Sequence, residues 1–318
     1  MKLFRAFDAK RIISWAGTAL MLAALFFVAR QLMVMRQDLD FSVLASPRVI
    51  AALLLIVCIE GFVIILASIN FRNLVANVSG VFVRYPLAVK VYTVSNLYKY
   101  IPGGVMYVLG RNRLAIETAE LSHGKVVLST VLEGAIFSLA AITISVAYAS
   151  DHSIHYIRQV YIPPVAILLL GLAALISILI LYLLRHRLSV FLSKLKKSVK
   201  GLHFTAFAKR FAFASALISL WAGTFLVTLM LLGQPVTPSL GFTVMGLYTL
   251  SWLAGLLAPG APGGLGIREA VILMFMSGML NEHILLPAIV MHRALNVAGD
   301  VAAYGMSFVF GYVCTEVK

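Results

Sequence analysis

Charged residues are scarce in this chain of 318 residues. Asp, Glu, Lys and Arg make up 12% of the sequence, about half the share of an ordinary soluble domain, whereas 61% of the residues are hydrophobic. Several apolar runs approach or exceed the roughly 20 residues that cross a hydrocarbon core. The composition therefore excludes a soluble globular protein and predicts an all-α polytopic membrane protein.

Cysteine is also rare, and no metal-binding pattern accompanies it. Cys58 and Cys314 both lie in apolar runs, without the spacing of a disulfide framework or a structural metal site. His152 and His155 share a polar loop but have no third ligand nearby. Neither glycine-rich stretch has the spacing of a dinucleotide or phosphate-binding loop, and no hydrolase pattern occurs. We expect no metal, no cofactor and no enzymatic activity.

Acidic residues are fewer than basic ones, with 12 Asp and Glu against 26 Lys and Arg. In a membrane protein such an excess marks cytoplasmic segments, so we expect no nucleic-acid partner. The most basic segment, 185–210, is predicted to be a cytoplasmic loop. It either binds anionic headgroups or is simply solvated.

Six apolar segments are predicted to be full spans: 12–29, 49–69, 125–149, 165–184, 211–232 and 286–311. The basic N-terminus and segment 185–210 both lie in the cytoplasm, with four spans between them. The intervening segment 87–113 must then cross an even number of times. It is too short for two crossings, which need about 40 residues.

Two segments are interrupted by Pro-Gly-Gly. "YIPGG" stands in the middle of 87–113, and "APGAPGGLGIREA" stands within 240–280. Proline removes a backbone donor, and glycine adopts conformations that other residues avoid. Irregular backbone at membrane depth persists only when it is buried in protein or lines a wet cavity. We predict two re-entrant hairpins whose tips meet near the midplane.

The two hairpins divide one integral membrane domain, 1–318, into similar halves. Residues 12–149 and 162–314 each place spans around a hairpin, the first entered from the cytoplasm and the second from outside. This pattern predicts an inverted-topology repeat with both termini in the cytoplasm. The alternative is chance recurrence of Pro-Gly-Gly in a glycine-rich membrane protein.

Several charged and polar residues fall inside the apolar segments. They are Glu60, Arg111, Glu133, Arg268, Glu269, His292, Arg293, Asn296 and Asp300. A charge at the bilayer centre costs at least about 2.5–3.5 kcal/mol, so a polar cavity with a function is one explanation. The other is a set of ion pairs, such as Arg293 with Glu133, that only join helices. His292, Asn296 and Asp300 are spaced by four and share one helix face.

The same motifs resemble the lysylphosphatidylglycerol synthase transmembrane-region family of flippase-like proteins, over nearly the whole chain. The resemblance is carried by "NLYKYIPGGVMYVLGR", the Glu of "VVLSTVLEG", "APGAPGGLGIREA" and "HRALN". The residues that match the family pattern are Asn96, Pro102, Gly103, Gly104, Arg111, Glu133, Pro262, Gly263, Gly264, Gly266, Glu269 and Arg293. Family members often have Arg directly after the membrane Glu. Here Gly134 follows, which leaves the partner of Glu133 open.

This resemblance implies a translocase of a bacterial-type inner membrane, for a lipid with an anionic, aminoacylated or glycosylated headgroup. The large soluble aminoacyl-transferase domain of the bifunctional members is lacking, so lysyl transfer is not expected. We expect Arg111, Arg268 and Arg293 to bind phosphate. Glu133, Glu269 and Asn296 would complete the substrate site, and Asn96 with the Pro-Gly-Gly residues would shape the hairpins. No nucleotide site is expected, so movement would be either facilitated or ion-coupled; in the second case the expected burial of Glu60 and Asp300 suggests that one of them carries protons.

Two other functions fit the same sequence. The chain could be a non-transporting accessory of a glycosyltransferase or another envelope-lipid enzyme, with segment 185–210 as its docking surface. It could also move a small solute or ion on the same inverted-repeat plan.

Overall fold

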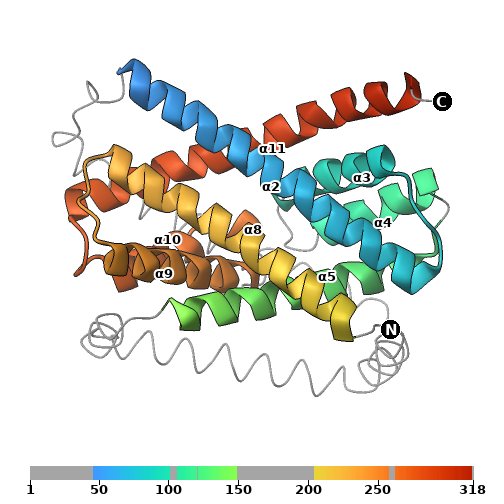
Figure 1. Cartoon of the computed structure of the whole chain (residues 1–318), viewed down its shortest axis with the longest axis horizontal. Coiled ribbons are helices and arrows are strands. Elements are labelled where there is room, and N and C mark those ends of the chain that lie inside the picture. The colour runs from blue at the N-terminus through green and yellow to red at the C-terminus, as the bar shows by residue number, and fades with distance from the viewer. Residues whose placement is uncertain (1–45, 101–105, 120, 149–203, 258–261, 317–318) are drawn as a thin grey trace, which may run out of the picture.

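The computed structural model describes residues 46–100, 106–119, 121–148, 204–257 and 262–316. Within these ranges the chain is helical and contains no strand (Figure 1). The elements are α2 (Pro47–Ser79), α3 (Tyr85–Leu97), η2 (Tyr98–Tyr100), α4 (Met106–Ala119), α5 (His123–Ala147), α8 (Phe204–Leu231), α9 (Pro238–Leu257), η3 (Pro262–Gly264), α10 (Ile267–Met276) and α11 (Glu282–Glu316). The predicted all-α class is confirmed for the described part of the chain.

Five of the described helices, α2, α5, α8, α9 and α11, are long and apolar enough to cross a membrane. Four of them match predicted spans. The fifth, α9, is the first arm of the predicted second hairpin, and its 20 residues extend about 30 Å. The predicted spans 12–29 and 165–184 and the basic segment 185–210 lie outside the described residues. The total number of spans and the re-entrant hairpins therefore stay predictions.

The other described helices are too short to cross alone. Helices α3, α4 and α10 have 13, 14 and 10 residues, which correspond to about 20, 21 and 15 Å. A hydrocarbon core is about 30 Å thick. Helices α3, α4 and α10 are therefore short enough to be arms of a hairpin that enters the membrane without crossing it. Helix α9 is longer than such an arm requires.

Helix α2 is longer than the predicted span 49–69. It begins at Pro47, whose missing N–H costs nothing in a first turn, and neither a second proline nor a glycine with positive φ follows before Gly80. Gly80 has a φ of 73°, and its N–H donates to Ala76 O at 2.8 Å, which ends the helix. The predicted end was wrong because polar Asn70 and Arg72 are compatible with a continuing helix.

The two halves of the described structure have the same element order and matching contacts. Helices α2, α3, α4 and α5 correspond to α8, α9, α10 and α11. In each half the first helix contacts the second and the fourth, and the third contacts the second and the fourth. The contacts between halves also exchange: α2 with α11 matches α8 with α5, and α3 with α11 matches α9 with α5.

Corresponding helices run in opposite directions across the view of Figure 1, α2 against α8 and α5 against α11. Each half also has its own apolar cluster, centred on Phe71 and Val126 in the first and on Phe225 and Met276 in the second. A third cluster, with Leu74 and Ile218, joins them. Opposed directions with exchangeable contacts are the arrangement that an inverted repeat produces.

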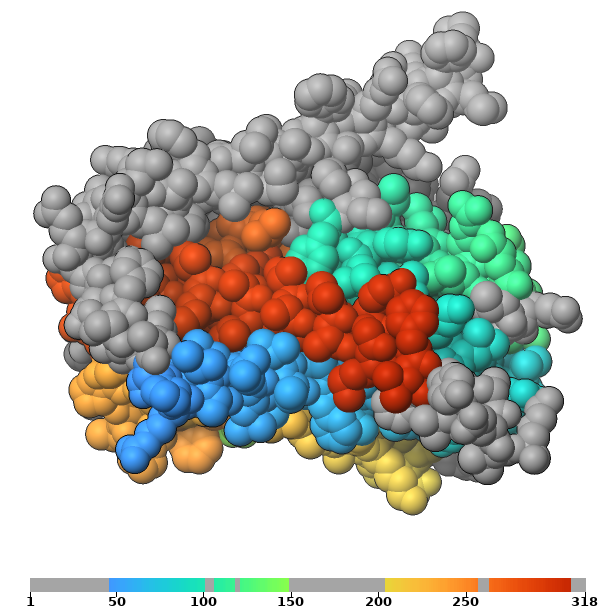
Figure 2. Space-filling model, turned by 90° about the horizontal axis from the view of Figure 1, so that it is seen from above, coloured from blue at the N-terminus to red at the C-terminus, as the bar shows by residue number. Residues whose placement is uncertain are grey.

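Helices α2 and α11 cross with their backbones in contact, and they lie side by side in both overall views (Figures 1 and 2). A Cβ atom added at Gly61 would stand 3.2 Å from Gly299 O, and one added at Gly299 would overlap the side chain of Glu60. Small residues at such a crossing let two membrane helices approach closely. The two halves thus approach each other closely at this crossing, beside Glu60.

We expect Gly299→Ala to destabilise the protein by about 1–3 kcal/mol, because the added methyl group overpacks the crossing. Gly305→Ala on the same helix is the matched control, since a Cβ there meets nothing within 4 Å. Thermal unfolding of the purified proteins in one detergent measures the difference. Equal melting temperatures for the two variants would contradict the close crossing.

Candidate functional site

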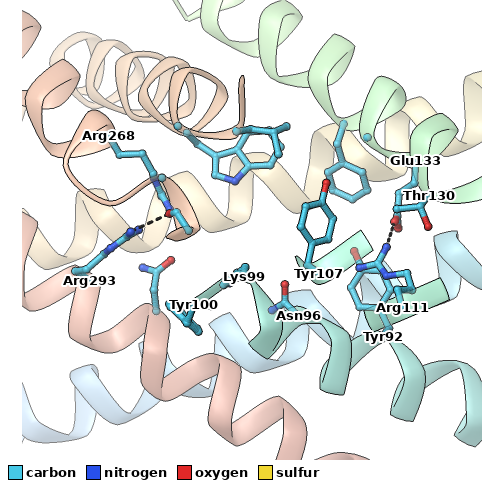
Figure 3. Close-up of a pocket in the computed structure, with 18 residues that line it drawn as sticks. Tyr92, Asn96, Lys99, Tyr100, Tyr107, Arg111, Thr130, Glu133, Arg268 and Arg293 are labelled. Atoms are coloured by element: carbon cyan, nitrogen blue, oxygen red, sulfur yellow. Dashed lines mark hydrogen bonds and ion pairs between the residues drawn. The ribbon is translucent and has the colours of Figure 1, made fainter. Parts of the chain in front are cut away.

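The end of the first hairpin arm meets the second helix break, because η2 contacts η3. Around them lies a cavity of about 240 Å³, walled by both halves of the chain (Figure 3). The residues that line it are Tyr92, Asn96, Lys99, Tyr100, Tyr107, Arg111, Thr130, Glu133, Gly134, Phe137, Trp252, Gly255, Leu256, Gly263, Gly264, Arg268, Arg293 and Asn296. The tip of the first hairpin lies outside the described residues, so the meeting of the two tips and their depth in a membrane stay predictions.

One end of the cavity is held by a buried ion pair. Arg111 of α4 and Glu133 of α5 lie with Nη1 and Oε2 2.6 Å apart, and both side chains are almost fully buried (Figure 3). The guanidinium also donates through Nε to Ser95 Oγ at 3.1 Å and lies 4.0 Å over the ring of Tyr92. Arg111 is therefore the partner of Glu133. The sequence had left this partner open, because Gly134 follows Glu133 where family members often have Arg. Glu133 Oε1 has no hydrogen-bond partner among the described residues.

The other end is held by a second pair. Arg293 Nε of α11 lies 3.3 Å from Glu269 Oε1 of α10, and Arg293 Nη2 donates to Gly263 O at 2.8 Å. Glu269 Oε2 accepts the backbone N–H of Gly266 at 2.5 Å, which caps the first turn of α10. The Arg293–Glu133 pair that we considered does not form, since each residue is paired within its own half.

The two pairs occupy equivalent places in the repeat, with the charges exchanged. In the first half the short helix α4 carries Arg and the long helix α5 carries Glu. In the second half the short helix α10 carries Glu and the long helix α11 carries Arg. Each pair fixes the second arm of a hairpin to the long helix that follows it.

Arg268 is the cation of the cavity that lacks such a pair. No acidic group of the described residues lies within ion-pair distance of it, although its residue is only 8% exposed. Its Nη2 donates to Tyr248 Oη at 3.1 Å, and its guanidinium lies 4.9 Å from the ring of Trp221. A buried cation with neutral neighbours favours an anionic ligand.

Two glycines make room for the Arg268 side chain. A Cβ at Gly255 would overlap the Arg268 methylenes, and one at Gly264 would stand 3.0 Å from Arg268 Cδ. Gly263, Gly264 and Gly266 have φ of 58°, 70° and 84°, conformations that glycine adopts without strain. The predicted hairpin-shaping role is thus visible in the backbone here. Pro102, Gly103 and Gly104 lie outside the described residues, and Pro262 begins η3.

Asp300 attaches α11 to the first hairpin. Its carboxylate lies 2.7 Å from Lys99 Nζ, accepts from Asn96 Nδ2 at 2.7 Å, and also accepts from the Tyr100 hydroxyl. All three donors lie at the end of the first arm, just before the break. Asp300 is therefore satisfied as a carboxylate by one cation and two neutral donors.

Glu60 lies outside the cavity lining, between α2, α8 and α11. It is 3% exposed, lies 2.7 Å from Thr224 Oγ1 and faces His292 Nε2 at 3.7 Å. His292, Asn296 and Asp300 share a helix face but contact different partners. His292 faces Glu60, and Asp300 binds Lys99. Asn296 Oδ1 accepts from Trp221 Nε1 at 3.1 Å.

The sequence prediction missed several cavity residues, notably Lys99, Tyr100, Tyr107 and Trp252. Lys99 had a usable signal, since it is a cation directly before the first helix break in an apolar segment. The aromatic residues had none, because aromatic side chains are common throughout the apolar runs.

Comparison of the chain with known protein families and with curated proteins finds no match.

Replacing Arg111 by Ala should destabilise the protein by about 3–5 kcal/mol, because it leaves Glu133 as an unpaired buried charge. Arg113→Ala is the control, since Arg113 pairs with Glu117 on the exposed surface. The double variant Arg111→Met/Glu133→Leu should recover most of the loss. Thermal unfolding in detergent provides the comparison. A double variant as unstable as Arg111→Ala would contradict a simple charge pair.

Proposed function

We propose that this chain is a translocase that moves the anionic headgroup of a membrane lipid across a bacterial-type inner membrane. The headgroup would be a phosphate, bare or joined to an aminoacyl or sugar group. The observation that carries the proposal is Arg268, a buried cation that lines the cavity between two broken hairpins and has no carboxylate partner among the described residues.

The charges around the cavity support an anion. Lys99, Arg111 and Arg293 are each paired with a carboxylate, whereas Arg268 is not. A phosphate beside Arg268 would supply the missing negative charge and accept two parallel N–H donors. Arg293 lines the same end of the cavity as Arg268, so we expect it to contact the same anion (Figure 3).

The size of the cavity supports a headgroup and not a whole lipid. Its volume of about 240 Å³ is below the range of roughly 300–1,000 Å³ that drug-sized ligands occupy. Apolar side chains such as Leu54, Phe62 and Val146 are exposed on the long helices, as lipid contact requires. In this account the acyl chains stay in the bilayer while the headgroup passes between the hairpin tips.

Alternating access follows from the arrangement of the halves. A site between two oppositely directed repeats opens to one side or the other when one repeat rocks against the other. The contact between η2 and η3 is where the two halves would part, and Arg268 stays beside the headgroup in both states.

We expect the purified protein, reconstituted in proteoliposomes, to move anionic lipids between the two leaflets. The assay follows phosphatidylglycerol, aminoacyl-phosphatidylglycerol and polyprenyl phosphate, each with a fluorescent tail, by chemical quenching of the outer leaflet; phosphatidylcholine is the neutral control. Arg268→Gln should slow the moving class about 10–100-fold, the equivalent of about 1.5–3 kcal/mol for bonds to a charged group. Arg113→Gln, which alters an exposed arginine, should leave the rate unchanged.

Equal movement of phosphatidylcholine would contradict headgroup selection. No movement of any lipid by folded protein would favour the accessory function, in which the chain presents lipid to an envelope enzyme.

Gly255→Ala tests whether the position of Arg268 matters apart from its charge. The added methyl group displaces the Arg268 methylenes, so we expect the lipid movement to slow at least tenfold with the arginine still present. Gly223→Ala on α8 is the control, because a Cβ there meets only the Met245 methyl group at 3.9 Å. Unchanged movement in Gly255→Ala would mean that the arginine acts only as a diffuse positive charge.

A further inference from the structure

Glu60 is a buried carboxyl that the headgroup site does not use. It lies beside the α2–α11 crossing, and no Lys or Arg of the described residues is within ion-pair distance of it. Its close polar neighbours are the hydroxyl of Thr224 and the ring of His292. A fully buried carboxylate without a cation is costly, so the chemistry around it needs an explanation.

The hydrogen bonds of His292 leave its second nitrogen as an acceptor. Thr228 Oγ1 donates its only proton to Thr224 O at 2.8 Å. Its oxygen can then only accept from His292 Nδ1, which lies 3.3 Å away. In this tautomer His292 Nε2 carries a lone pair, has no hydrogen-bond partner, and faces Glu60 Oε1 at 3.7 Å. Two acceptors facing each other in a buried site repel unless one of them holds a proton.

The contacts of Thr224 also indicate a proton on Glu60. Its hydroxyl has one hydrogen but lies 2.6 Å from Trp221 O and 2.7 Å from Glu60 Oε1. If the hydrogen goes to Trp221 O, the contact with Glu60 is a hydrogen bond only when Glu60 is the donor. One additional proton on Glu60 can be donated either to Thr224 Oγ1 or toward His292 Nε2, and in both cases it removes the negative charge that faces the lone pair of His292.

Asp300, the other acidic residue considered for proton transfer, has no such need. It holds Lys99 at 2.7 Å and accepts from Asn96 and Tyr100, so its charge is already compensated. Its role is to position the end of the first hairpin arm.

The groups that act electrostatically on Glu60 come from several elements. The charged or titratable ones are His292 and Asp300 of α11, Lys99 of η2, Tyr248 of α9 and Arg268 of α10. The remaining charges on the helices packed against α2 are engaged or distant: Glu133 of α5 is paired with Arg111, and Lys90 of α3 is exposed. Glu60 thus lies in the electrostatic field of Arg268, the cation of the headgroup site.

A second, small cavity beside His292 shares lining residues with the headgroup site. Its volume is about 10 Å³, close to the space that one water molecule requires. His292 lines it, and Arg268, Arg293 and Asn296 line both this cavity and the larger one. A single water there could pass a proton between His292 and the headgroup cavity.

We propose that Glu60 and His292 form a binding site for one proton, and that the protein moves this proton together with the anionic headgroup. The coupling rests on the proposed translocase function. A proton on Glu60 removes a negative charge near Arg268 and so strengthens anion binding there. By linkage, a bound anion strengthens proton binding by the same factor. Proton and headgroup then cross in the same direction.

The experiment imposes a pH gradient on proteoliposomes that contain phosphatidylglycerol with a fluorescent tail. One proton per lipid sustains at most about a tenfold difference between leaflets per pH unit. We expect wild type to enrich the lipid on the alkaline side. Glu60→Gln, which resembles the protonated state, should keep exchange without a gradient within about threefold and lose the enrichment. His292→Gln should lose it too, and Glu117→Gln, an exposed control, should behave as wild type.

Infrared spectroscopy of the purified protein gives a readout that does not depend on transport. We expect a protonated-carboxyl band that is lost in Glu60→Gln and kept in Glu117→Gln. Exchange without enrichment in wild type, or enrichment that persists in Glu60→Gln, would overturn the coupling and leave the translocase standing. No exchange in wild type would overturn the translocase and the coupling with it. Absence of the band would overturn the proton site itself.

Discussion

A helix that breaks inside an apolar molecule leaves backbone groups that only protein can satisfy, and the rest of this structure depends on that constraint. At the second break, Arg293 donates a hydrogen bond to Gly263 O, and Glu269 accepts one from the N–H of Gly266. The same two side chains pair with each other across α10 and α11. One ion pair thus closes the backbone of η3, caps α10 and attaches the hairpin to the last helix.

The first half solves the corresponding problem with the charges exchanged. Arg111 and Glu133 join α4 to α5, and Asp300 of the other half holds the residues just before the first break. The end of the first hairpin arm is therefore positioned by the second half, whereas the second break is held by side chains of its own half. In this arrangement the paired charges hold helices together, and Arg268 is the cavity cation that has no carboxylate partner among the described residues. Its place is fixed by Gly255 and Gly264, which admit its side chain between α9 and η3.

Much of this fold could be predicted from the sequence because membranes leave few choices. Apolar length gave four of the long described helices, and the second Pro-Gly-Gly triplet gave the break at η3. The first triplet lies outside the described residues. The polar residues inside apolar segments pointed to the cavity, since burial of a charge is too costly to be incidental. The pairing of those charges could not be predicted. It depends on how helices rotate against each other, so Arg293–Glu133 was as plausible as the two pairs within each half. The aromatic walls and Lys99 were missed for the related reason that their role exists only once the tips meet.

The central claim is that an anionic headgroup binds at Arg268, and the most direct measurement is a structure of the protein in nanodiscs of phosphatidylglycerol. Our account predicts density for a phosphate within hydrogen-bonding distance of the Arg268 guanidinium, inside the cavity between η2 and η3. Lipid headgroups found only around the outer surface, with Arg268 bound to a carboxylate of the protein instead, would contradict it.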